Sequence, residues 1–308
     1  TPLSVARGRF VRRKELLIVT KAYSRSTVHR PVHMDYVGVR RFDAHGKVVG
    51  EHRFLGLFTS IAYNQSPRYI PLLRRKIARV MTRSGFSPHG HDGKSILNIL
   101  ETFPRDELFQ TSEEDLLETS LGVLKLEERR RVALFVRRDF LEQFVSCLVY
   151  IPHDRYSSDL INRFQGILED ALGGVLNGFS TQVGDEPLAR VHFTFKLTPG
   201  AGKKMRDRDI EALLVAAARS WSDELSTALV LSKGEGVGLG LMKQYGEAFS
   251  VAYREAFSPP DAVADVDDVG VALKTGGRRF NLYRPDKSEK QEARFKIIHA
   301  GATLAPSD

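Results

Sequence analysis

The chain has 308 residues, 42% of them hydrophobic, which is enough for two or three packed domains. No run approaches the roughly 18 apolar residues that a membrane-spanning helix needs, and no signal-peptide pattern opens the chain. The one cysteine, Cys147, excludes a disulfide within the chain. It lies in an apolar run, so we expect it in the core of a cytoplasmic protein rather than at a catalytic centre.

The formal net charge of +8 raises the question of nucleic-acid binding. Basic clusters at residues 12–14, 74–76, 129–131 and 137–138 would suit phosphates. Acidic runs are interleaved with them, however, and no recognised nucleic-acid motif accompanies them. We therefore expect solvated faces or interfaces with other parts of the protein, and nucleic acid is not an expected partner.

The first 63 residues are rich in β-forming side chains. Three strands are predicted, at Leu16–Thr20, Val32–Phe42 and Val48–Ser60. Asp43 and Gly46 lie between the second and third and suit a hairpin turn. This pattern predicts an antiparallel meander.

Helical patterns follow over residues 64–128. Ser66 and Pro67 are expected to open a helix that ends at Gly85, and a second is expected over 92–102, closed by Pro104. Ser112 and the acids after it predict the start of a third helix, running through Leu116–Leu124.

Residues 129–198 change to a mixed pattern. It predicts strands at 132–137, 144–151, 175–183 and 188–197, with a helix between the second and third that Ser157 caps and Gly173 ends. Strand, strand, helix, strand, strand makes an α+β unit with the helix on one face of the sheet.

The rest of the chain is predicted to begin with a linker at 199–202, followed by two helices. These helices are expected at Asp207–Leu231 and Leu239–Phe257. Asp261–Asp268 is expected to be an acidic linker, and strands are expected at Val269–Tyr283 and Ala293–His299.

Several stretches have a distinctive sequence: TVHRPVHMDYVGVRRFD (27–43), GEHRFLGLFTSIAYNQSP (50–67), ILETFPRDELFQ (99–110) and RDFLEQFVSCLVYIPHDRY (138–156). They resemble the non-catalytic N-terminal region of the large bacterial NAD-dependent glutamate dehydrogenases. The similarity extends along most of the 308 residues. It also implies that the sequence is a piece of a longer enzyme, cut at both ends, because Thr1 is not a methionine and GATLAPSD follows directly on a strand.

The resemblance implies an α+β fold made of modules. Residues 1–63 would be the later half of a PAS-like module, 64–128 a helical connector, 129–198 a ferredoxin-like ACT-type domain and 199–262 a helical motif. Residues 263–308 would begin another ACT-like module.

The resemblance also implies a role. The chain would be a regulatory or oligomerisation segment of an enzyme that converts L-glutamate, NAD and water to 2-oxoglutarate, ammonia and NADH. NAD would belong to the parent enzyme only, because neither the substrate-binding lysine pair nor the nucleotide-binding fold of the catalytic domain is found here. Expected partners are the remainder of the polypeptide, further copies in a homo-oligomer and an amino-acid effector. The alternative is a free-standing PAS and ACT metabolite sensor without catalysis.

The run Gly234–Gly240 is the strongest candidate for a nucleotide-binding loop. A dinucleotide fingerprint needs GxGxxG after a strand, and here the third glycine falls out of register after a predicted helix. We predict a flexible loop between helices.

No other pattern predicts chemistry. His29 and His33 with Asp35, and His89 and His91 beside Asp92, lack the third or fourth ligand of a metal site. No serine lies in a pattern that suggests a nucleophile with its base. Charges beside strand ends are the candidates for an effector or interface site, and they are His29, Arg30, Asp35, Arg138, Asp139, Asp154 and Arg155.

Overall fold

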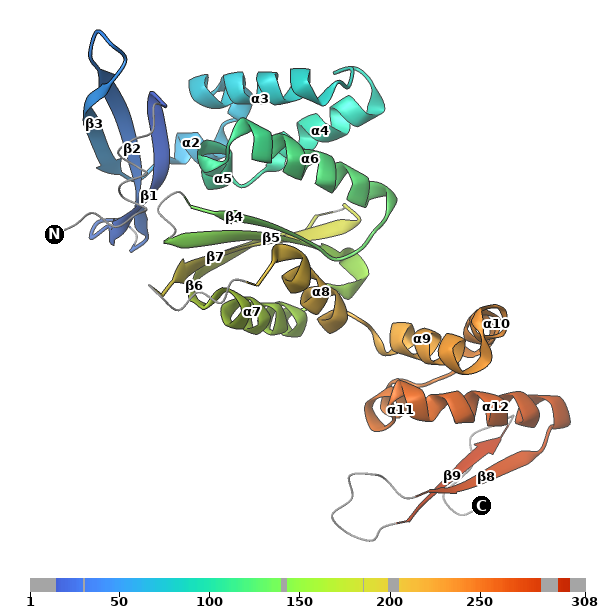
Figure 1. The fold of residues 1–308 in the computed structure, drawn as a ribbon. Helices are drawn as coiled ribbons and strands as arrows, with labels where there is room; N and C mark the ends of the chain where they lie inside the picture. Colours follow the sequence, from blue (N-terminus) through green and yellow to red (C-terminus); the bar gives the residue numbers. More distant parts are fainter. Residues whose placement is uncertain are drawn as a thin grey trace. The chain divides into compact units, whose positions relative to one another are not determined.

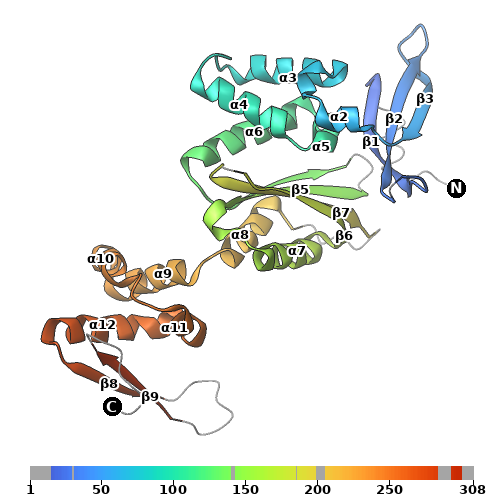
Figure 2. The same ribbon diagram turned by 180° about the vertical axis from the view of Figure 1, so that it is seen from behind.

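A computed structural model describes residues 15–29, 31–139, 143–184, 186–198, 205–283 and 293–299 (Figures 1 and 2). The chain divides into two compact units, residues 1–218 and 219–308, which we describe separately. Helices and antiparallel strands occur in both, which confirms the predicted α+β class. The expected linker at 199–202 and the terminal GATLAPSD lie outside the described residues. None of the helices in the described ranges is both long and apolar enough to cross a membrane.

The first unit begins with the predicted meander. Its strands are β1 (Leu17–Arg25), β2 (His33–Phe42) and β3 (Val48–Gly56), antiparallel and in that order across the sheet. One carboxylate oxygen of Asp43 accepts hydrogen bonds from the backbone N–H groups of two residues in the turn, and Gly46 takes a positive φ of 73°. The third strand was predicted to end at Ser60, but it ends at Gly56. A short helix, α2 (Ser60–Asn64), follows.

The helical connector starts later than predicted. Ser66 and Pro67 open a single turn of 3-10 helix, and the α-helix itself begins at Pro71. Either proline fits a first helical position, so the sequence signal was ambiguous. Gly85 ends the helix in the left-handed conformation as expected, with φ 76°. The elements are η1 (Pro67–Tyr69), α3 (Pro71–Ser84), α4 (His91–Thr102), α5 (Arg105–Gln110) and α6 (Glu113–Glu128).

A four-stranded antiparallel sheet follows, in the order β4-β5-β7-β6. This is the spatial order of a ferredoxin-like sheet in which the usual last strand comes first in the chain. β4 therefore occupies one edge of the sheet. The elements are β4 (Ala133–Arg138), β5 (Phe144–Pro152), η2 (His153–Arg155), α7 (Ser158–Leu172), β6 (Gly174–Gln182), β7 (Leu188–Leu197) and α8 (Asp207–Ala217).

Helices cover both faces of this sheet (Figures 1 and 2). α7 and α8 lie on one face, where Phe164 and Ile210 pack with Val191 and Phe193. Helices of the connector lie on the other face, with Leu148 and Tyr150 of β5 in their core. Every residue of β5 is consequently buried, Cys147 included, and burial raises the pKa of that thiol. The prediction of Cys147 as a core residue is confirmed.

The helices of the second unit share a core of Leu225, Leu229, Tyr245, Phe249, Ala262 and Val266. Trp221, the only tryptophan of the chain, packs against this core and donates to the carbonyl of Phe257 at 2.8 Å. A two-stranded antiparallel sheet completes it. Its elements are α9 (Trp221–Lys233), α10 (Glu235–Tyr245), α11 (Val251–Ala256), α12 (Pro259–Thr275), β8 (Arg278–Tyr283) and β9 (Arg294–His299).

Two predicted helices are each broken in two. The helix expected at 207–231 stops at Ala217, and a new one starts after Ser220, whose side chain forms a capping box with Asp223. The helix expected at 239–257 breaks before Ser250, which caps α11. Apolar periodicity runs through both breaks, so it did not reveal them.

The glycine run and the acidic stretch were also assigned wrongly. After Gly234, with φ 83°, the glycines continue inside helix α10 rather than forming a loop. Residues 261–268 are not a linker either, because a capping box of Ser258 with Asp261 starts helix α12 there. This helix runs to Thr275, so the strand expected from Val269 begins only at Arg278. Two of its acids bind strand residues, Asp265 with Lys296 and Asp268 with Arg279.

Candidate functional site

A buried ion pair of the first unit connects helix α5 to the edge strand β4. Arg137 donates from Nε to Oε2 of Glu107 at 2.6 Å and from Nη2 to Oε1 at 2.7 Å. The Glu107 side chain is 6% exposed and that of Arg137 is 19% exposed. Gln110 accepts a further bond from Nη2 at 3.2 Å. This two-bond geometry is the strong form of a carboxylate–guanidinium contact.

Two polar side chains of the sheet extend this pair. Nε2 of His192 lies 2.9 Å from Oγ of Ser146 and 3.6 Å from Oε1 of Glu107. Burial alone raises the pKa of Glu107, but the charge and hydrogen bonds of Arg137 outweigh it and hold that pKa well below 4.5. Glu107 is thus a carboxylate, held by its neighbours, and has no free proton to transfer.

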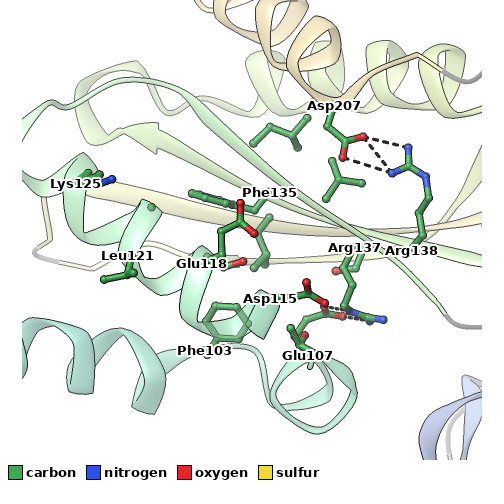
Figure 3. A pocket seen from close by; sticks show the side chains of 17 residues that line it. Phe103, Glu107, Asp115, Glu118, Leu121, Lys125, Phe135, Arg137, Arg138 and Asp207 are labelled. Atoms are coloured by element: carbon green, nitrogen blue, oxygen red, sulfur yellow. Dashed lines mark hydrogen bonds and ion pairs between the residues drawn. The ribbon is translucent and has the colours of Figure 1, made fainter. Parts of the chain in front are cut away.

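A cavity of about 660 Å³ opens beside the pair (Figure 3). It lies along β4, with α6 on one side and Asp207 at the start of α8 on the other. Figure 3 shows Asp207 bound to Arg138, with Glu107 and Arg137 at the far side of the cavity. Its lining combines four acids, three bases, apolar side chains and hydroxyls: Glu107, Asp115, Glu118 and Asp207; Lys125, Arg137 and Arg138; Phe103, Leu121, Leu134, Phe135, Val136 and Leu148; Thr111, Thr119 and Ser146; and Gly122.

The exposed rim of the cavity belongs to α6. Asp115, Glu118 and Lys125 follow one another at three- and seven-residue spacing, which places them along one face of the helix. Deeper in, Thr111 directly follows α5 and is 5% exposed. Its hydroxyl has no hydrogen-bond partner in the part of the chain that the structure describes. Ser146 of the lining lies beside His192, but the same Nε2 of that imidazole also faces Glu107, and the rest of the lining offers paired charges and apolar surface, which suits binding rather than catalysis.

The predicted effector residues are not brought together. Arg138 lines the cavity, where it binds Asp207 at 3.1 Å. Asp139 directly follows β4, and its carboxylate instead accepts from the backbone N–H groups of Gln143 and Phe144 at the start of β5. Of the predicted residues that the structure describes, Arg138 alone lines this site.

The remaining predicted residues lie elsewhere in the first unit. Asp35 is buried and accepts from Lys21 at 2.6 Å and from the backbone N–H of Phe58 at 3.0 Å. His29 lies ahead of β2, with a positive φ of 63°. Asp154 and Arg155 belong to η2, and Arg155 donates to the carbonyl of residue 218. Arg30 lies outside the described residues.

The residues that build the cavity were mostly missed. Arg105–Glu107 begins helix α5, and Glu107 belongs to the buried ion pair. The partner Arg137 lies 30 residues away, in a basic cluster that was expected to form a solvated face or an interface with other parts of the protein. Thr111, Asp115 and Glu118 carried no signal beyond the capping pattern of α6. Among the described residues, no three His, Cys, Asp or Glu side chains gather as a metal site would need.

Comparisons with known proteins agree with this architecture. Three family models match: glutamate dehydrogenase helical motif 1 over residues 70–129, the ACT2 domain over 133–222 and helical motif 2 over 228–269. The α5–β4 pair thus joins helical motif 1 to the ACT2 domain.

Whole proteins match as well. Over all 308 residues of the chain, it is 40% identical to an NAD-specific glutamate dehydrogenase of Halomonas elongata. It is 36% identical to one of Pseudomonas aeruginosa over 97% of the chain, and 34% identical to one of Mycobacterium tuberculosis over 98% of the chain. It spans only 18–19% of the length of these relatives. The three matched segments follow one another along the chain as helical motif 1, the ACT2 domain and helical motif 2. The chain therefore belongs to the family of large NAD-specific glutamate dehydrogenases.

Proposed function

We propose that the chain is a regulatory and assembly segment of a cytoplasmic enzyme that oxidatively deaminates L-glutamate to 2-oxoglutarate with NAD. The match along the whole chain to proteins named NAD-specific glutamate dehydrogenase carries this proposal. NAD would bind elsewhere in the complete enzyme, because the glycine run lies inside helix α10 and no strand precedes it. A free-standing sensor remains the alternative, and the relatedness to dehydrogenases disfavours it.

The contact between helical motif 1 and ACT2 supports a regulatory role. Lys76 of α3 donates to the carbonyls of Leu108, Phe109 and Thr111 at the end of α5, and α5 in turn holds Arg137 of the ACT2 sheet. A ligand in the neighbouring cavity would touch both modules at once. It would act as an allosteric effector if it bound two arrangements of this contact unequally.

The outer modules complete the proposal. Residues 1–63 would be the later half of a PAS-like module, and residues 263–308 the beginning of a further ACT-like module. The exposed apolar side chains of β8 and β9, among them Phe280 and Phe295, would then face the rest of that module or another copy in a homo-oligomer.

The test compares the complete protein that carries this segment with the segment alone. With L-glutamate and NAD, the complete protein should form NADH, followed at 340 nm, and residues 1–308 should form none. A complete protein that forms no NADH from L-glutamate would refute the proposed enzyme. NADH formation by residues 1–308 would refute a purely regulatory role for them.

A further inference from the structure

We infer that the cavity between α6 and β4 binds a small aliphatic molecule that carries an ammonium group. This inference deepens the proposed regulatory function, because it names the class of ligand for the same cavity. It depends on three observations: the balance of paired and unpaired charges in the lining, one buried hydroxyl without a partner, and the apolar surface between the charges.

The charges leave an acidic end. Glu107 is bound by Arg137, and Asp207 by Arg138, so these four side chains compensate one another. Asp115 and Glu118 form no ion pair within the described ranges, and the charge of Asp115 also acts on Arg137, so this end of the cavity holds Glu107, Asp115 and Glu118 against one base. The protein as a whole carries a net charge of +8, so this acidic end differs from the average surface. It would attract a cation and repel a simple anion.

The remaining cation lies far from these acids. Lys125 is seven residues beyond Glu118 on α6, which corresponds to about 10 Å along the helix axis. Figure 3 shows it at the opposite end of the cavity from Asp115. Lys125 would therefore not repel a ligand ammonium that lies beside the two acids. It could bind a carboxylate at the other end of the same ligand.

A buried hydroxyl supplies a neutral partner. Thr111 lines the cavity, is 5% exposed and has no hydrogen-bond partner in the described ranges. The hydroxyl oxygen has almost no surface open to the cavity, but leaving it unpaired is unfavourable, so a rotation of the Thr111 side chain toward a ligand would remove a cost already present in the free protein. An ammonium group has three donors, enough for the hydroxyl and both carboxylates.

The surface between the two ends is apolar. Phe103, Leu121 and Phe135 line it, and Figure 3 shows Leu121 on the Lys125 side of Glu118. Such a surface favours methylene groups over a polar or strongly hydrated body. The combination of an acidic end and an apolar floor fits an alkyl chain that ends in an ammonium group.

The test titrates residues 1–308 by calorimetry with pentylamine, 1-pentanol and lysine. Pentylamine should bind saturably, and 1-pentanol, of the same shape without the charge, at least about tenfold more weakly. Lysine distinguishes the source of the ammonium. Tighter binding of lysine than of pentylamine would support a basic amino acid whose carboxylate reaches Lys125, and weaker binding would support a simple amine or diamine.

Variants locate the site. Asp115→Asn with Glu118→Gln should weaken pentylamine binding at least about tenfold. Glu114→Gln should not change it, because that side chain is on the same helix but does not line the cavity. Equal binding of 1-pentanol and pentylamine, no binding of either, or full binding by the double variant would overturn the inference. Both acids are exposed, so the double variant should fold, which circular dichroism checks. The two tests are independent. An absence of amine binding would leave the outcome of the NADH assay on the complete protein unchanged, and a negative NADH assay would leave the outcome of this titration unchanged.

Discussion

The carboxylate of Glu107 in α5 and the guanidinium of Arg137 in β4 share two hydrogen bonds of 2.6 and 2.7 Å in a setting almost closed to water. This contact joins helical motif 1 to the ACT2 sheet through charge rather than through apolar packing alone. A buried pair of this kind adds little net stability compared with an apolar pair, but removing one partner leaves the other charge buried. The pair therefore fixes how the two modules meet.

Glu107→Gln should lower the free energy of unfolding by about 3–5 kcal/mol, because Arg137 would keep its buried charge without a counter-charge. Urea unfolding followed by far-UV circular dichroism measures this change. Glu113→Gln is the matched control, since it removes an exposed pair with Arg79 and should cost at most about 1 kcal/mol. Equal effects of the two substitutions would show that the buried pair is unimportant.

Acid should weaken the same contact. The pKa of Glu107 is held below its ordinary 4.5, so the folded protein takes up this proton less readily than the unfolded chain does. The stabilisation is complete above about pH 4.5 and is lost as the pH falls further. Urea unfolding at a series of pH values from neutral to acid should show a steeper loss of stability for the native protein than for Glu107→Gln. Parallel curves would refute the assigned pKa direction.

Substituting alanine for the glycines of α10 should change the stability of the second unit in opposite directions at Gly238 and Gly240. A methyl group at Gly238 would lie 2.6 Å from the Cα atom of Val230 in α9, so Gly238→Ala should destabilise the second unit by about 1–3 kcal/mol. Gly240 has no atom within 4 Å of the same position, and Gly240→Ala should stabilise the helix by about 1 kcal/mol. Fluorescence of Trp221, which packs in that unit, reports both changes. A stabilising Gly238→Ala would mean that α9 and α10 do not cross closely there.

Local signals predicted the first unit well. Ser112 and Ser157 cap α6 and α7 as expected, Gly173 ends α7, and Leu188–Leu197 is a strand with the predicted bounds. These features depend on neighbours in sequence, which is why they could be recognised. The antiparallel meander followed for the same reason, from the turn chemistry of Asp43 and Gly46.

Features decided by distant residues could not be predicted. The acids of α12 suggested a linker until their partners in β8 and β9 were known, since Asp265 is buried against Lys296. Glu107 likewise meets its partner only after β4 has joined the sheet. The candidate cavity depends on β4 lying at the sheet edge, and strand order is not encoded in any single stretch.

The most direct test of the regulatory assignment is a calorimetric titration with NAD, done in parallel on residues 1–308 and on the complete protein that carries them. The complete protein should bind NAD saturably, and residues 1–308 should give only heats of dilution. Saturable binding of NAD by residues 1–308 would contradict the account, because it would place a nucleotide site in a segment that we assign to regulation and assembly.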